Sequence, residues 1–201
     1  MMTTTQELIP YTEIADESWS RLAAASNDLA HPMRVVTLAT LAACGSPDAR
    51  TISLRGANRG RARLWFHSDR RASKVAQIRE RAEVCVVGYD PRDGVQLRLR
   101  GRATVHTSDH VAAQHWEQTS MAMRYLYRMA YPPGWPLPVQ DPRTELMEAA
   151  MRLGANPDGR ENFAVIQVTV ESIQWWQVQE IEQRTALLRG ENDWRVEPLT
   201  S

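Results

Sequence analysis

Short apolar runs separated by turn residues occupy most of the chain, a pattern typical of antiparallel strands joined by tight connections. Apolar residues with a period of two, or in unbroken runs, predict strands at Val35–Cys44, Thr51–Ala57, Ala62–His67, Val84–Tyr89, Val95–Thr107, Phe163–Val170, Ile173–Val178, Thr185–Arg189 and Trp194–Val196. Many connections are too short for the crossovers that parallel strands need, so an antiparallel barrel or sandwich is expected.

Helical patterns interrupt this β-rich texture. We predict helices from Glu13 to Leu29 with Ile14, Trp19, Leu22 and Ala23 on its inner face and Thr12 as its cap, from Ser68 to about Arg81, from Ser108-Asp109 to about Tyr131, and from Asp141-Pro142 to Gly154. The segment Pro132 to Pro142 carries five prolines, which predicts an irregular loop.

The chain length favours one domain. With 201 residues, no internal repeat and no low-complexity linker, we expect residues 1–201 to form a single unit, with an N-terminal helical segment at 1–30 and a helical insertion with a proline-rich loop at 108–154. A domain of this size buries about 70% of its unfolded surface, so it needs no disulfide or structural metal.

Charge and composition exclude several classes of protein. Hydrophobic residues make up 43% of the chain, and 24 basic residues balance 24 acidic ones, which argues against a disordered chain and against a general electrostatic grip on nucleic acid or membrane. The start of the chain lacks a signal-peptide pattern, and no apolar stretch is long enough for a membrane span. We expect a cytoplasmic protein in which Cys44 and Cys85 are reduced and buried.

Common catalytic motifs are absent from the sequence. There is no GxxxxGK[ST], GxGxxG or GxSxG pattern. His106, His110 and His115 do not share a helix face at metal-ligand spacing, so no metal site is expected. These absences argue against a P-loop or Rossmann nucleotide-binding fold, a metalloenzyme and a serine hydrolase.

The most informative stretch is the joint Ser68-Asp69-Arg70-Arg71-Ala72-Ser73-Lys74, where a strand leads into a helix. A helix N-terminus favours an anion, and two arginines, a serine hydroxyl and Lys74, the single lysine of the chain, could converge on a phosphate there. Alternatively, these side chains only decorate the helix. Arg50 favours the phosphate, because it shares a strand face with apolar residues and needs a partner, unless it lies exposed at the end of the strand.

Another strand carries polar residues along one face, namely Gln96, Arg98, Arg100 and Arg102, with Leu97 and Leu99 on the other. The Gln96 amide could hydrogen-bond to a polar ring. A solvated barrel face or a wet subunit interface would give the same pattern.

The order of these motifs resembles the pyridoxamine 5'-phosphate oxidase-like, FMN-binding split-barrel family. The matching segments are Arg-Thr-Ile-Ser-Leu-Arg at 50–55, Leu-Trp-Phe-His-Ser at 64–68, Arg-Ala-Ser-Lys at 71–74, Gln96 on the strand ending in Gly101-Arg102-Ala103, Trp175-Trp176, Arg184, and Glu-Asn-Asp-Trp-Arg-Val-Glu-Pro-Leu at 191–199. The resemblance covers the chain from about His31 onward. It implies a mainly β fold, a six-stranded antiparallel Greek-key split barrel with peripheral helices, and a homodimer with FMN at the subunit interface.

The resemblance also implies roles for individual residues. Arg50 and Lys74 would hold the FMN phosphate, with help from Ser73 and Arg71. The remaining cofactor-binding residues would be the backbone of Thr51, Ile52 and Ser53 along the isoalloxazine, Arg55 beside the ring where the family usually has lysine, Phe66 with His67 in place of the usual threonine, Gln96 at the flavin edge, and Trp175 or Trp176 (Trp176 preferred) with Arg184 from the partner subunit. No residue is assigned as a catalytic acid or base.

The implied function is an FMN-dependent oxidoreductase acting on a small organic substrate. Authentic pyridoxamine 5'-phosphate oxidase activity is disfavoured, because Glu180 and Glu182 stand where such oxidases have an Arg-Leu-His triplet, and carboxylates would repel a substrate phosphate. Two further interpretations are a flavin carrier without turnover and a split barrel that binds F420 or haem instead of FMN.

Overall fold

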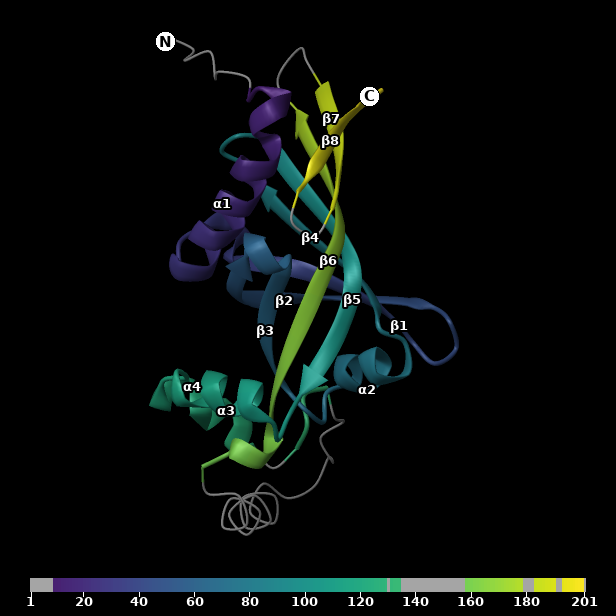
Figure 1. The fold of residues 1–201 in the computed structure, drawn as a ribbon. Helices are drawn as coiled ribbons and strands as arrows, with labels where there is room; N and C mark the ends of the chain where they lie inside the picture. The colour runs from purple at the N-terminus through teal and green to yellow at the C-terminus, as the bar shows by residue number, and fades with distance from the viewer. Residues whose placement is uncertain (1–8, 130, 135–157, 179–182, 191–192, 201) are drawn as a thin grey trace.

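One antiparallel sheet that closes on itself forms the centre of this computed structural model, which describes residues 9–129, 131–134, 158–178, 183–190 and 193–200. Its strands are β1 (Val35–Leu41), β2 (Pro47–Asn58), β3 (Arg63–Asp69), β4 (Glu83–Asp90), β5 (Val95–His106), β6 (Phe163–Val178), β7 (Gln183–Arg189) and β8 (Arg195–Leu199). The order is β3-β2-β1-β4-β5-β6-β7-β8, and pairing of β3 with β6 closes the first six strands into a barrel (Figure 1).

The strand order confirms the predicted barrel. Strands β1, β2 and β3 follow one another as hairpins, and β4 returns to pair with β1, which is the Greek-key arrangement. Alternate residues of each strand point inward, and the fully buried core residues include Leu38, Leu54, Phe66, Val86, Leu97 and Ile166. The period-two pattern in the sequence therefore reflects one buried and one more exposed barrel face.

Strand β6 is a single strand of 16 residues, so the prediction of two strands at Phe163–Val170 and Ile173–Val178 is wrong. The pairing with β5 shifts register at Arg100/Gly101, and the ladder continues on both sides of the shift. A bulge bends a strand without ending it. Glu171 and Ser172 interrupt the apolar pattern there, while the backbone stays extended.

The first strand ends earlier than predicted. Strand β1 stops at Leu41 rather than Cys44, because the chain turns back where Ala42 N–H donates to the Ser46 carbonyl at 2.9 Å. Strand β2 accordingly begins at Pro47, before the predicted strand start at Thr51. Cys44 lies in this turn and is exposed, so its predicted burial is wrong; Cys85 is half-buried, and both thiols are free.

Helix α2 (Ser73–Glu80) begins five residues later than the predicted cap at Ser68, which is therefore wrong. Strand β3 continues through Asp69, since its pairing with β6 extends to Asp69↔Phe163. The next residue still follows this edge, because Arg70 N–H donates to the Asn162 carbonyl at 2.7 Å. Pairing with β6 thus outweighs the local capping signal.

The predicted single helix from Ser108-Asp109 to Tyr131 is instead divided into α3 (His110–Glu117), α4 (Met121–Arg124) and the 3₁₀ turn η4 (Tyr125–Arg128). Asp109 does cap α3, accepting from Ala112 N–H. The break follows from two hydroxyls: Thr119 Oγ1 donates to the His115 carbonyl, and Ser120 caps the next helix. Side chains of this kind compete with the helical backbone bonds.

Helix α1 (Ile14–Asn27) covers one side of the barrel and buries Ile14, Trp19 and Leu22 as predicted, together with Ala15, Ser18 and Ala25. Ala23, also predicted on this face, is only half-buried. The short 3₁₀ turn η1 (Tyr11–Glu13) precedes it, and no side chain caps the helix, so the predicted Thr12 cap is wrong. A second 3₁₀ turn, η2 (Pro32–Arg34), leads from α1 into β1. Two further 3₁₀ turns are η3 (Arg59–Arg61) and η5 (Arg160–Asn162).

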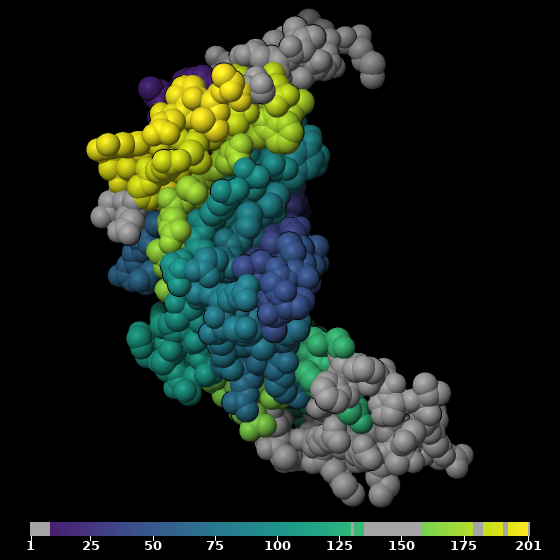
Figure 2. All heavy atoms as spheres, turned by 90° about the vertical axis from the view of Figure 1, so that its right-hand side faces the viewer, coloured from purple at the N-terminus to yellow at the C-terminus, as the bar shows by residue number. Residues whose placement is uncertain are grey.

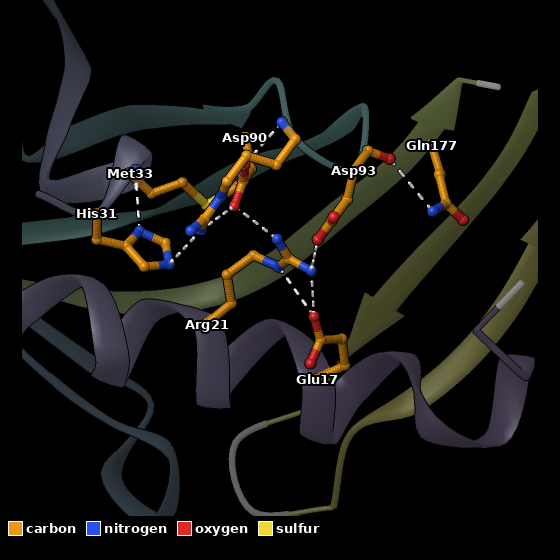
Figure 3. Close-up of polar contacts among 8 residues, drawn as sticks. Glu17, Arg21, His31, Met33, Asp90, Asp93 and Gln177 are labelled. Atoms are coloured by element: carbon orange, nitrogen blue, oxygen red, sulfur yellow. Dashed lines mark hydrogen bonds and ion pairs between the residues drawn. The ribbon is translucent and has the colours of Figure 1, made fainter. Parts of the chain in front are cut away.

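An ion-pair network, the α1 clamp, joins Arg21 of α1 to Glu17 and to Asp90 and Asp93 around the β4–β5 turn (Figure 3). Arg21 Nη1 lies 2.7 Å from the buried Asp90 carboxylate, and Arg92 holds the same carboxylate from the turn. These contacts fix α1 against the barrel.

The molecule is elongated. Helix α1 lies with β7 and β8 toward one end, and α3 and α4 lie toward the other (Figure 1). Between them, the β1–β2 hairpin projects from the face shown in Figure 2. No helix in the described part of the chain has the length and apolar character to cross a membrane. The predicted helix from Asp141 to Gly154, most of the proline-rich loop, and Glu180 and Glu182 lie outside the described residues.

Candidate functional site

A cationic cluster lies where the barrel end meets α2. Arg50 is on the inward face of β2, opposite Leu38 of β1, and its guanidinium donates to Thr40 Oγ1 at 2.5 Å and to Gln77 Oε1 of α2 at 3.1 Å. Asp48 forms an ion pair with it at 2.6 Å. The predicted need of Arg50 for polar partners on an apolar strand face is thus met by three side chains.

Lys74 is the second cation of this cluster. It lies half-buried in the first turn of α2, and its ammonium makes no hydrogen bond or ion pair with any residue in the described part of the chain. Burial lowers the pKa of Lys74, and the neighbouring Arg50 charge lowers it further. The structure therefore brings Arg50 and Lys74 together, as predicted, and leaves Lys74 beside a like charge.

The two other predicted phosphate residues differ in their availability. Arg71 is engaged, because its guanidinium pairs with Asp69 at 2.7 Å and donates to the Met129 carbonyl. Ser73 is exposed as the first residue of α2, and the cap residue Ala72 offers no side chain to the helix N-terminus. The predicted joint thus remains at a helix start, although that helix begins later than expected.

Along β2 the predicted residues alternate between the two barrel faces. Thr51 is exposed, Ser53 and Arg55 are half-buried, and Ile52 faces the core. Phe66 of β3 is fully buried in the barrel. The side chains of Ile52 and Phe66 face the core, so these two residues could border a ligand on the outer face only through their backbone.

Arg55 and His67 come together in a pocket of about 290 Å³ between the barrel and α3–α4. We call it the Arg55 pocket, and it is lined by Arg34, Arg55, His67, His115, Gln118, Thr119, Ser120 and Met123. Arg55 makes no hydrogen bond or ion pair with any described residue, whereas Arg34 donates to the Ala25 and Ser26 carbonyls at the end of α1. The pocket wall thus carries two guanidinium groups and no carboxylate.

The two histidines of the Arg55 pocket face each other, with His67 Nε2 at 3.1 Å from His115 Nδ1. Burial lowers the pKa of His67 to about 3, assisted by His115 and by the Arg55 and Arg34 charges. Burial also lowers the pKa of His115. Both imidazoles are therefore neutral at pH 7.

Gln96 and Trp176 are directly paired across β5 and β6 and lie half-buried on the same face. Trp175 is fully buried in the core, so Trp176 is the one of the two tryptophans that could face a ligand. Arg184 lies on the Trp175 side: its guanidinium is 4.3 Å from the Tyr11 ring centre and 5.8 Å from that of Trp175. Within one chain, Arg184 does not join the pair.

Sequence reasoning missed several side chains around these groups. Thr40, Asp48 and Gln77 hold Arg50, and Arg34 and His115 complete the Arg55 pocket. In the sequence, His115 stands out only as a candidate metal ligand, and the described residues contain no group of histidine, cysteine and carboxylate side chains suited to a metal. Its meeting with His67 requires the fold, because the two residues are 48 positions apart.

Comparison with known proteins supports the predicted family. Residues 16–107 match the family model described as "Pyridoxamine 5'-phosphate oxidase, FMN-binding domain". This segment includes the Arg50–Lys74 cluster, Arg55, His67 and Gln96. A search of the curated proteins finds no significant match.

Solved structures share the fold at low sequence identity. A pyridoxamine 5'-phosphate oxidase-related, FMN-binding protein from Nostoc punctiforme superposes with a TM-score of 0.73 at 22% identity, covering 98% of this chain and 100% of that one. PhzG from Burkholderia lata, solved with tetrahydrophenazine-1-carboxylic acid, gives 0.70 at 17% identity, covering 98% of each chain. A Clostridium acetobutylicum protein related to general stress protein 26 gives 0.53 at 14% identity, covering 88% and 95%. These likenesses confirm the split-barrel fold.

Proposed function

We propose that this protein binds FMN and acts as an FMN-dependent oxidoreductase on a small organic substrate. The observation that carries the proposal is Lys74, a half-buried ammonium beside Arg50 that makes no hydrogen bond or ion pair with a described residue, although the Asp69 and Asp48 charges act on it. Asp48 is the carboxylate that forms an ion pair with Arg50, so a further anion would stabilise the two neighbouring cations, and the FMN phosphate is such an anion. The match of residues 16–107 to an FMN-binding domain supports this choice.

The residues present fit FMN, with cations placed for its phosphate and the β2 strand leading from them toward the position of its ring. Arg50 and Lys74 would hold the phosphate, with Ser73 at the helix start. The outer face of β2, from Thr51 to Ser53, leads from this cluster toward Arg55 and would border the ring. When bound, FMN would supply the two-electron chemistry, and the protein would bind and orient it.

A homodimer with FMN at the subunit interface is part of the proposal. Gln96 and Trp176 lie on an outer barrel face that is half-buried within one chain, and a second copy could cover it. Within one chain Arg184 points away from Gln96 and Trp176, so in the proposed dimer the Arg184 that reaches this site would come from the partner subunit. Sedimentation of the purified protein tests the dimer, and a monomer at micromolar concentration would contradict it.

The test of FMN binding is the absorption spectrum of the purified protein and of the double variant Arg50→Ala/Lys74→Ala. The wild type should show two flavin bands in the near-ultraviolet and blue. Charge-assisted bonds contribute about 1.5–3 kcal/mol each, so the variant should bind added FMN at least about 100-fold more weakly. The double variant Arg61→Ala/Arg79→Ala, at two exposed positions, is the matched control.

Each outcome separates one candidate function from the next. A folded double variant that still purifies with FMN would place the phosphate elsewhere, and a Soret band would indicate haem. A flavin that no nicotinamide or amine donor reduces would indicate a carrier without turnover. Hydrogen peroxide formed from pyridoxamine 5'-phosphate would identify an authentic oxidase.

A further inference from the structure

His67 of β3 and His115 of α3 form an imidazole pair inside the Arg55 pocket. Their Nε2 and Nδ1 atoms are 3.1 Å apart, and the rings meet edge to face at 88°. Phe163 packs against His67 with ring centres 4.9 Å apart, and Trp65 lies 6.2 Å from His115. Aromatic rings thus pack against both imidazoles, which also line the pocket.

The charged and titratable groups around the pair are nearly all cationic or neutral. Arg34 faces it from η2 and Arg55 from β2, and His106 at the end of β5 acts on His115. His106 is itself paired with Asp109 at 2.7 Å. Tyr127 of η4 lies near Arg55, and burial raises its pKa to about 12, so it is neutral.

Such a pair has one shared hydrogen. In a neutral pair, one ring donates its N–H and the other accepts, which leaves one nitrogen of each ring for solvent or ligand. A proton taken up by either ring would give a hydrogen-bonded imidazole–imidazolium pair. What prevents this uptake is burial together with the charges of Arg55 and Arg34, which form no ion pair with a described residue.

An anion in the pocket would remove one obstacle to proton uptake, namely the guanidinium charges. Arg55 makes no ion pair with a described residue, so an anionic group can bind it without displacing a carboxylate. The anion would neutralise the charge that now opposes protonation, and it would itself attract a proton to the pair. Anion binding and proton uptake would then favour each other by the same factor.

We propose that the His67–His115 pair takes up one proton when a small anionic ligand binds Arg55 in this pocket, so that the pocket binds anion and proton together. A volume of about 290 Å³ accommodates an anion built on a single ring. The inference goes beyond the flavin proposal and does not require it, because the pair, the arginines and the pocket belong to the chain itself.

The test uses benzenesulfonate, which stays ionised at every pH of interest, and the protein as purified. Its Kd, measured by calorimetry, should tighten between pH 7 and pH 5, by up to about tenfold per pH unit where one proton is taken up. Repeating the titration in buffers of different ionisation enthalpy counts the protons directly. Benzenesulfonamide, a neutral analogue, should cause no proton uptake.

Variants separate the pair from the arginine. Arg55→Gln should weaken benzenesulfonate at least about tenfold at both pH values, whereas His67→Thr/His115→Asn should bind it with a Kd that no longer depends on pH. Imidazole ¹⁵N NMR of the wild type should show a raised pKa for the pair when the ligand is bound. Equal affinity at pH 5 and pH 7, a pH dependence that survives in the double variant, or no binding at millimolar concentration would overturn the proposal.

Discussion

Replacing Asp90 with asparagine removes the central carboxylate of the α1 clamp while keeping its shape. Asp90 is fully buried and accepts from Arg21 Nη1 at 2.7 Å and from Arg92 Nε and Nη2 at 3.0 and 2.7 Å (Figure 3). These hydrogen bonds, led by that of the Arg92 side chain, lower the pKa of Asp90 to about 2. Its carboxylate therefore stabilises the folded state.

The magnitude follows from this pKa. Each pKa unit is worth about 1.4 kcal/mol, so lowering the pKa of Asp90 from 3.8 to about 2 corresponds to about 2 kcal/mol of folding free energy. Arg92 is exposed, and solvent screening reduces the expected value to roughly 1–2 kcal/mol. Because the folded pKa is depressed, this stability is complete above about pH 4 and is lost as the pH falls toward 2.

Urea unfolding of the wild type and Asp90→Asn, followed by tryptophan fluorescence, measures the effect across pH. The variant should be less stable by roughly 1–2 kcal/mol at pH 7, and the difference should shrink as the pH falls below 4, where protonated Asp90 resembles asparagine. Asp93→Asn is the control, since Asp93 also contacts Arg21 but is only half-buried. A difference between wild type and Asp90→Asn that stays constant down to pH 2.5 would refute the reasoning.

Two further predictions concern single positions. Gly101→Ala should lower the free energy of unfolding by about 3 kcal/mol, because a Cβ there would lie 2.0 Å from the Thr169 carbonyl oxygen, and a variant as stable as the wild type in urea would contradict the bulge geometry. Cys44 should react with a thiol reagent at pH 7 at least about tenfold faster than Cys85, because Cys44 is exposed and its hydrogen bond with Ser46 lowers its pKa, whereas burial raises the pKa of Cys85. The variant Cys44→Ser should lose the fast phase of the reaction, and Cys85→Ser should keep it.

The barrel strands were predictable because their buried residues recur along the chain. Alternation of buried and exposed residues in β2 and β5 appears directly in the sequence as a period of two. Closure of the barrel was not predictable from this pattern, since the pairing of β3 with β6 joins residues about 100 positions apart. The family resemblance supplied that feature.

The predicted helix boundaries were wrong where two structural signals competed. Ser68 has the chemistry of a cap, but β6 pairs with the chain up to Asp69 and keeps it extended. Thr119 and Ser120 look like ordinary polar positions of a helix surface, yet their hydroxyls end α3 and start α4. At Ser68 the deciding contact is the tertiary pairing with β6. At Thr119 and Ser120 it is a local hydroxyl hydrogen bond, which is one of several that such a side chain can make.

The site was predictable where charge alone revealed it. Arg50 and Lys74 stood out as cations on an apolar strand face and at a helix start, and the structure brings them together. Arg34 and His115 carried no such signal, because Arg34 of η2 comes near Arg55 through the pairing of β1 with β2, and His115 meets His67 only when α3 packs against the barrel.

The two cations of the cluster should contribute unequally to holding a phosphate. Arg50 already bonds to Asp48, Thr40 and Gln77, so a phosphate approaching its Nη2 must compete with the Asp48 carboxylate. Lys74 has no such partner among the described residues, and neutralising it also relieves its repulsion from Arg50. A bound phosphate therefore gains from Lys74 without breaking an existing contact, whereas at Arg50 it exchanges one anion for another. If the proposed phosphate binds here, we expect Lys74 to be the stronger anchor and Arg50 to act mainly through its charge at this end of the barrel.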